Sequence, residues 1–287
     1  MCGLFGWFTL LLQKLFKMAM SMGSFATRTV ATVVIALDGT GDFTDIQEGL
    51  NSLPATGGGV YIKEGTYNIN ATIEIDIDSV SLIGSGASTI IHPTGNFPAI
   101  TIQLPAGVGE SVTIEKLKIY GTGAGVAQHG IYAEDFNRIW LYNLWIEHLG
   151  GNGVYIISST FASLISLWVT DADGDGFKFV TSYNNFIDSC VVYDCGGNGL
   201  YTEDCERCQT HKSSYEQNGG YGINLATSVG GYGFHHFIIG NYVSGNLTGD
   251  IIINADIVKT VCLGNITDGI IDNGTNTEIG HNFEATY

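Results

Sequence analysis

The chain is poor in basic residues and in proline, and it lacks a hydrophobic run long enough to cross a membrane. Lys and Arg number 11 against 28 Asp and Glu, so the formal net charge is −17. Because nucleic acids and anionic membranes repel such a chain, we expect neither as a main partner. Proline occurs 4 times and glycine 40 times, with 45% hydrophobic residues, which fits repeated tight turns around a core and excludes disorder.

A 23-residue repeat organises residues 130–222. Its blocks begin "GIYAEDF", "GVYIISS", "GFKFVTS", "GLYTEDC" and "GINLATS", and their opening glycines are Gly130, Gly153, Gly176, Gly199 and Gly222. A second set with the same step is Gly151, Gly174, Gly197 and Gly220. Self-similarity at a fixed period is the signature of a repeat architecture.

Each block contains two short β-rich runs separated by clusters of Gly, Asn and Asp. Val154–Ile157 and Ser163–Val169 are one such pair, and no block holds ten residues of helical pattern. The sequence therefore predicts an all-β solenoid with about 23 residues per coil. Coils stack roughly 4.8 Å apart, so residues 23 positions apart should lie above one another. We expect the recurrent glycines at corners that need a positive φ or a close backbone approach.

Residues 1–22 form an unusual N-terminal stretch. The run from Met1 to Leu12 carries no charge, but it is shorter than the roughly 18 residues that span a bilayer. Its positive charges follow the apolar run, whereas a secretory signal carries them before it. We predict a hydrophobic helix that is buried in an assembly, with a helix in a membrane interface as the alternative. The predicted domains are residues 1–30, this helix and a linker, and residues 31–287, the solenoid.

A second, short amphipathic helix is predicted before the first coil. Asp42 or Thr44 can cap it, and Phe43, Ile46, Leu50 and Leu53 would share one face, with Pro54 ending it. Such a helix would cover the open end of the solenoid, where unpaired strand edges invite aggregation.

The stretch 38–67 resembles the entry signature of the pectin-lyase-like right-handed parallel β-helix superfamily. The matching residues are Asp38-Gly39-Thr40-Gly41, Ile46-Gln47, Gly58-Gly59-Val60 and Gly65-Thr66-Tyr67, followed by coils of the family's kind, so the resemblance covers about residues 34–280. It implies a right-handed parallel β-helix. It leaves activity open, because the superfamily includes polysaccharide lyases, glycoside hydrolases, epimerases, esterases and phage tailspikes.

The second position of each repeat forms a candidate binding strip. It reads Tyr132, Tyr155, Lys178, Tyr201 and Asn224, between apolar neighbours, so strand alternation points it outward. Aromatic faces with polar tips suit sugar rings, a use that the family resemblance also implies. An aromatic ladder that stabilises the sheet or faces a sister subunit is the equally open alternative.

Carboxylates near this strip are the catalytic candidates. Glu203 and Asp204 follow Tyr201, and Asp171 and Asp173 lie in the turn before Lys178. Glycoside hydrolysis needs two carboxylates roughly 5–10 Å apart. The string "DADGDG" is equally an ordinary series of Asx turns. His129 and His148 are expected to be surface residues.

Six cysteines are scattered through the chain: Cys2, Cys190, Cys195, Cys205, Cys208 and Cys262. None shares a repeat position with another, so no disulfide ladder is expected, and most are read as buried small hydrophobes. Cys205, Cys208 and His211 have metal-like spacing but lack a fourth ligand. We predict no metal and no cofactor.

Two functions are compatible with these observations. The catalytic motifs of polygalacturonases, pectinesterases, pectate lyases and alginate epimerases are absent or only echoed, as in Tyr232-Gly233-Phe234-His235-His236. The first hypothesis is therefore a virion-type receptor-binding protein, a homotrimeric tailspike or fibre on the virion surface or tail. It would contact cell-surface polysaccharide, and other particle proteins through residues 1–22. The alternative is a secreted or cell-surface polysaccharide lyase, hydrolase or epimerase.

Overall fold

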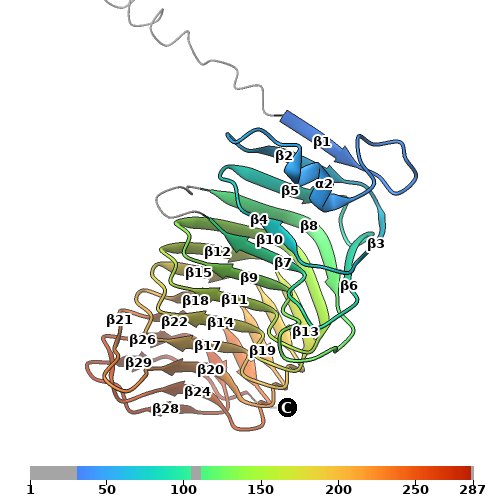
Figure 1. Cartoon of the computed structure of the whole chain (residues 1–287). Helices are drawn as coiled ribbons and strands as arrows, with labels where there is room; N and C mark the ends of the chain where they lie inside the picture. Colours follow the sequence, from blue (N-terminus) through green and yellow to red (C-terminus); the bar gives the residue numbers. More distant parts are fainter. Residues whose placement is uncertain (1–30, 105–110, 286–287) are drawn as a thin grey trace, which may run out of the picture. The chain divides into compact units, whose positions relative to one another are not determined.

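The chain winds into a right-handed parallel β-helix, as the repeat and the family resemblance predicted (Figure 1). The computed structural model describes residues 31–104 and 111–285; the helix predicted in residues 1–22 lies outside them. Each regular coil contributes one strand to a nine-stranded sheet, here called sheet B, and two strands to an 18-stranded sheet, sheet A. The all-β prediction is therefore confirmed.

The strands of sheet B are β4 (Ile73–Ile75), β7 (Ile100–Gln103), β9 (Ile131–Glu134), β11 (Val154–Ile157), β14 (Phe177–Val180), β17 (Leu200–Glu203), β20 (Tyr221–Ala226), β24 (Gly249–Ile253) and β28 (Ile270–Asp272). The strands of sheet A are β1 (Ala31–Ile35), β2 (Gly58–Ile62), β3 (Gly65–Ile69), β5 (Val80–Gly84), β6 (Thr89–Pro93), β8 (Val112–Tyr120), β10 (Arg138–Leu149), β12 (Phe161–Ile165), β13 (Trp168–Ala172), β15 (Asn185–Asp188), β16 (Val191–Tyr193), β18 (Gln209–His211), β19 (Ser214–Glu216), β22 (Phe237–Ile239), β23 (Tyr242–Ser244), β26 (Val261–Leu263), β27 (Ile266–Thr267) and β29 (Glu278–Gly280). β21 (Gly233–Phe234) pairs separately with β25 (Ile257–Val258).

The strand register reproduces the 23-residue step of the sequence. Val154 pairs with Ile131 in the coil before and with Phe177 in the coil after, and Phe177 pairs with Leu200. These four side chains are at most 2% exposed, so each coil places an apolar side chain on the one below it. Burial of these internal files is the main force that holds the coils together.

The block-opening glycines are required by close backbone approach rather than by a positive φ. A Cβ atom added to Gly153 would lie 2.6 Å from the carbonyl oxygen of Gly176, and one added to Gly176 would lie 2.9 Å from that of Gly199. The second set makes room for a polar side chain of the preceding coil, since a Cβ at Gly174 would lie 2.6 Å from Asn152 Oδ1. The close-approach half of the glycine prediction is thus correct.

The corners with positive φ are occupied by other residues. Asp204, Ser166 and Asp171 have φ values of 52°, 57° and 55°, and the residues 23 positions away repeat the conformation at each corner. These single left-handed residues bend the chain between strands. Among residues other than glycine, Asn, Asp and His adopt this conformation most readily.

The short helix α2 (Ile46–Asn51) is present, but its predicted caps were wrong. Asp45 is the N-cap, and its carboxylate accepts a hydrogen bond from Glu48 N at 2.9 Å. Asp42 accepts instead from Val34 N, which ties the turn to β1. Ile46 and Leu50 are buried as predicted. Figure 1 shows α2 beside the first strands, at the N-terminal end of the coils.

Candidate functional site

The tyrosine–lysine strip lies on the outer face of sheet B, where the repeat placed it. Tyr132, Tyr155, Lys178 and Tyr201 are direct cross-strand neighbours on β9, β11, β14 and β17. Lys178 Nζ lies over the rings of Tyr155 and Tyr201, 5.1 and 5.4 Å from their centroids. The rings of Tyr132 and Tyr155 meet edge to face at 5.5 Å. The strip is thus a continuous surface of three phenol rings and one cation.

His129 extends this surface at the start of β9. Its ring stacks on Tyr132, with centroids 6.2 Å apart, and meets Tyr155 edge-on at 5.4 Å. Burial, and secondarily the charge of Lys178, lower the pKa of His129 to about 4, so the imidazole is neutral at pH 7. His129 Nδ1 accepts a hydrogen bond from Asn152 N at 2.9 Å.

The sequence predicted His129 only as a surface residue and not as a neighbour of the strip. The 23-residue step could have placed it, because it aligns position 129 with three polar residues of later coils. Residues 129, 152, 175 and 198 form one file in the turn before sheet B. Asn152 Oδ1 accepts from Asp175 N at 2.8 Å, and Asp175 Oδ1 accepts from Asn198 N at 2.7 Å. This polar ladder fixes the turns that position the strip.

Two glutamates hold the ends of the strip. Tyr132 Oη donates to Glu134 at 2.7 Å, and Tyr201 Oη donates to Glu203 at 2.8 Å. Burial, together with these hydrogen bonds, raises the pKa of both phenols, so they remain protonated donors. Because each phenol is already oriented by its carboxylate, it keeps its oxygen lone pairs available to a ligand.

The predicted catalytic carboxylates fall into two separate places. Glu203 is engaged with Tyr201, and its counterpart Glu134 lies three coils away in the same file, about 14 Å at ~4.8 Å per coil. Asp204 accepts hydrogen bonds from Ser228 N at 3.0 Å and from Ser228 Oγ, so it anchors the inserted loop after β20. The catalytic roles of Glu203 and Asp204 stay predictions.

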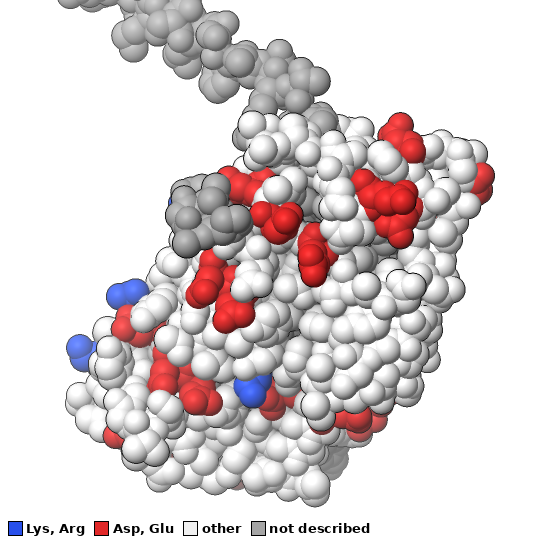
Figure 2. Space-filling model, viewed as in Figure 1, with Lys and Arg blue, Asp and Glu red and all other residues white. Residues whose placement is uncertain are grey.

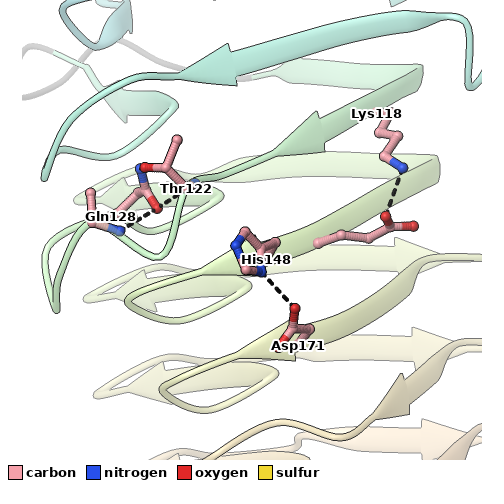
Figure 3. Close-up of polar contacts among 7 residues, drawn as sticks. Lys118, Thr122, Gln128, His148 and Asp171 are labelled. Carbon is pink, nitrogen blue, oxygen red and sulfur yellow. Dashed lines mark hydrogen bonds and ion pairs between the residues drawn. The ribbon is translucent and has the colours of Figure 1, made fainter.

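Asp171 lies on β13 of sheet A and Asp173 in the turn that follows it toward sheet B, and both line a groove. The groove has a volume of 670 Å³, and Asp194, Gln217 and Leu247 also line it. Asp171 is paired with His148 Nδ1 of the preceding coil at 2.7 Å (Figure 3). His148 is a surface residue as expected, since its side chain is 46% exposed. The catalytic roles of Asp171 and Asp173 likewise stay predictions.

The cysteines of the described residues are unpaired and buried, as predicted for Cys190, Cys195, Cys205, Cys208 and Cys262. The spacing of Cys205, Cys208 and His211 does not bring the three together. His211 lies on the outer face of sheet A, 5.4 Å from the Phe186 ring, while the fully buried His236 contacts Cys208 inside. Within residues 31–104 and 111–285, no group of three or more His, Cys, Asp or Glu is arranged to hold a metal ion.

The charge distribution matches the acidic composition. On the face seen in Figure 2, acidic side chains are far more numerous than basic ones. Lys178 is the single Lys or Arg in the strands of sheet B, so it is an isolated positive point on the strip. In the described part of the chain, no helix is long and apolar enough to cross a bilayer.

Fold and site together define a parallel β-helix protein with an outward aromatic strip. The family model described as "Right handed beta helix region" matches residues 106–282. The chain therefore belongs to the right-handed β-helix family. A curated protein, "Probable pectinesterase/pectinesterase inhibitor 12" of Arabidopsis thaliana, is 38% identical over 68 residues, which are 23% of this chain and 12% of that protein.

Solved structures with low sequence identity share the fold. The Agl-KA catalytic domain is 16% identical and has a TM-score of 0.56, over 88% of this chain and 54% of that one. The catalytic domain of a GH87 α-1,3-glucanase in complex with nigerose is 13% identical with a TM-score of 0.51, over 87% and 58% of the chains. ORF18 of Geobacillus virus E2 is 17% identical with a TM-score of 0.49, over 86% and 59%. This chain thus spans less than two thirds of the length of these proteins.

Proposed function

We propose that this protein is a receptor-binding β-helix protein that binds cell-surface polysaccharide along the outer face of sheet B. The observation that carries the proposal is the tyrosine–lysine strip, in which four consecutive coils present Tyr132, Tyr155, Lys178 and Tyr201 in register. Phenol rings offer flat apolar surface, and their hydroxyls can exchange hydrogen bonds with sugar hydroxyls. A linear chain of sugars lying along the solenoid axis would contact several coils at once.

Lys178 indicates the chemistry of the ligand. It is the one cation among the outward side chains of sheet B. Cation–π contacts with the tyrosines on either side, Tyr155 and Tyr201, fix the position of its ammonium group. A carboxylate or sulfate group of an acidic sugar would pair with Lys178, while neighbouring rings would stack on the tyrosines. The likeness in fold to the glucanase domain that was solved with nigerose is consistent with a sugar ligand on this scaffold.

The proposed location of the protein is a virion surface or tail. There the chain would form a homotrimer, and residues 1–22 would contact other particle proteins. It rests on the uncharged run from Met1 to Leu12 and on the lack of the catalytic motifs named above. A secreted or cell-surface location is the alternative.

Isothermal titration of acidic and neutral polysaccharides against the full chain tests the proposal. Tyr155→Ala and Lys178→Met should each weaken binding at least about tenfold, the loss typical of a central contact. Tyr61→Ala is the matched control, because Tyr61 is an exposed tyrosine on β2 of sheet A, and it should bind as the unaltered protein does. Equal affinity of all four proteins, or no binding to any polysaccharide, would remove the proposal.

A second candidate function is cleavage of the polysaccharide, as a lyase, hydrolase or epimerase. The 670 Å³ groove with Asp171, Asp173 and Asp194 favours it, since it brings carboxylates to an open cleft beside sheet B. Incubation with the same polysaccharides, followed by size analysis of the products, tests it. Catalysis would be supported if the unaltered protein released products and Asp173→Asn did not. If the polysaccharide stayed unchanged with the unaltered protein, only the binding function would remain.

A further inference from the structure

Two indole rings lie side by side on the outer face of sheet A. Trp145 on β10 and Trp168 on β13 are direct cross-strand partners in consecutive coils, and they are 37% and 47% exposed. Within the described residues, neither ring stacks on another aromatic ring, and neither indole N–H donates a hydrogen bond to the protein. The pair, here called the indole platform, is therefore an apolar surface with two N–H donors available to a ligand.

A file of polar side chains borders the indole platform. Glu147 lies two residues after Trp145 on β10, so strand alternation places it on the same face. Thr170 lies two residues after Trp168 on β13 and is the cross-strand partner of Glu147. Tyr193 on β16 pairs in turn with Thr170. The file thus sets a carboxylate, an aliphatic hydroxyl group and a phenol beside the two rings.

An ion pair holds Glu147 in position. Lys118, the cross-strand partner of Trp145 in the preceding coil, binds Glu147 Oε2 through its Nζ at 2.6 Å (Figure 3). The same ammonium group lies 5.0 Å from the centroid of the Tyr120 ring. Among the described residues Glu147 has no other partner, so its Oε1 can accept a hydrogen bond from a ligand. The pair also adds no net charge to the surface.

The polar file runs into the 670 Å³ groove. Asp171, the residue after Thr170, lines the groove, and so does Asp194, the residue after Tyr193. Tyr193 Oη donates a hydrogen bond to Gln217 Oε1 at 2.8 Å, and Gln217 is also part of the groove lining. Three residues at ~3.3 Å each, about 10 Å along β13, separate the indole platform from this lining. A ligand that lies across the strands would therefore contact the rings and the groove together.

The charges of this region favour an uncharged, hydroxyl-rich ligand. Asp171, Asp173 and Asp194 line the groove, and no Lys or Arg is among the described residues that line it. An anionic polysaccharide would be repelled there. A protein partner would have to take the carboxylates of the groove and the Lys118–Glu147 pair out of water, which is costly without matching charges. Sugar hydroxyl groups can instead pair with carboxylates and indole N–H groups while sugar rings lie on the indoles.

We propose that the indole platform and the adjoining groove form a second glycan site, which takes an uncharged polysaccharide. Sugar rings stack on Trp145 and Trp168, and their hydroxyl groups exchange hydrogen bonds with the indole N–H groups, Glu147 and Thr170. The groove carboxylates accept hydrogen bonds from hydroxyl groups further along the glycan. The site lies on sheet A and needs no cleavage, so it stands apart from the strip, whose Lys178 would select acidic sugars, and from the second candidate function.

Isothermal titration of the full chain with dextran, a mixed-linkage β-glucan and a galactomannan tests this. The unaltered protein should bind at least one of them, and Trp168→Ala should weaken that binding at least about tenfold, the loss typical of a central aromatic contact. Trp140→Ala is the matched control and should bind as the unaltered protein does. Trp140 lies on the part of β10 that pairs with β12, and its ring meets that of Phe161, with centroids 6.4 Å apart. Trp168→Ala should keep its affinity for acidic polysaccharides, so failure of the strip and failure of this site give different results.

Tryptophan fluorescence gives a readout that a purely structural role would not move. The bound polysaccharide should shift the emission of the unaltered protein, and the shift should vanish in the double variant Trp145→Ala with Trp168→Ala, whose circular dichroism should be unchanged. Trp168→Phe should keep part of the affinity, because it retains a stacking ring and loses the N–H donor.

Three results would overturn the proposal. The first is no binding of the unaltered protein to any of the three uncharged polysaccharides. The second is equal affinity of the unaltered protein and folded Trp168→Ala for the one that binds. The third is a mass of two or more chains in analytical ultracentrifugation that Trp168→Ala reduces to one chain, because it would show that this face is covered by protein.

Discussion

Replacing Gly153 by Ala tests whether close stacking of coils sets the glycine repeat. The added Cβ would lie 2.4 Å from Val169 Cγ1 and 2.6 Å from the carbonyl oxygen of Gly176. The valine can shift, but the carbonyl belongs to the strand ladder that joins two coils, so the coils must separate locally. Overpacking of this kind costs about 1–3 kcal/mol. For a domain of this size each kcal/mol lowers Tm by about 2–4 °C, so the expected drop is about 2–12 °C.

Gly269→Ala is the matched control for this experiment. No atom lies within 4 Å of the Cβ that would be added there, and its φ is outside the left-handed region. The change should be neutral or should stabilise the fold by about 0.4–1 kcal/mol, because alanine restricts the unfolded chain. Thermal unfolding followed by circular dichroism compares the three proteins. Equal Tm values for Gly153→Ala and Gly269→Ala would refute close packing as the reason for the repeat.

Further predictions concern the strip, the inserted loop and the cysteines. The imidazole of His129 should titrate in NMR with a pKa of about 4, below its ordinary 6.5, chiefly because it is buried. Since only the unfolded chain binds this proton between those values, stability should fall by about 2 kcal/mol as the pH drops from 6.5 to 4, after allowance for partial exposure; a pH-independent Tm would contradict this. Lys178→Met should raise the pKa of His129 in the same titration, because it removes a repulsive charge. Asp204→Ala should speed amide exchange at Ser228, which loses its carboxylate partner, without changing binding at the strip. Cys190, whose pKa burial raises to about 12, should resist alkylation at pH 8 until the protein is denatured; rapid labelling of the folded protein would show that it is accessible.

Much of the fold could be predicted because a solenoid is periodic. Tyr132 and Tyr155 are neighbours in space for the same reason that they are 23 residues apart in the chain. Alternation within each strand then fixed which side chains face outward. The N-cap of α2 was harder to predict from the sequence, because Asp42, Thr44 and Asp45 have similar capping chemistry. The fold selects Asp45, since the turn places Asp42 against the backbone of Val34 instead.

The acid–base properties of the site were not accessible in this way. The low pKa of His129 depends on burial and on Lys178, which lies two coils away and 49 residues later in the chain. The sequence likewise gave no partner for the carboxylate of Asp204, whereas in the structure the inserted loop places Ser228 within hydrogen-bond distance of it. Neither contact follows from local pattern, because each joins a repeat position to a segment that packs against it in space.

The amino-acid sequence by itself determined the coil, its 23-residue period and the outward file of Tyr132, Tyr155, Lys178 and Tyr201, because local alternation and a constant step are sufficient to stack strands. The tertiary structure decided which of these side chains are charged, paired or free to bind. It also showed that the glycines are needed for close approach of coils and that sheet A leaves tryptophans exposed. Those properties depend on distances between coils and on what covers each face, and a linear pattern contains neither.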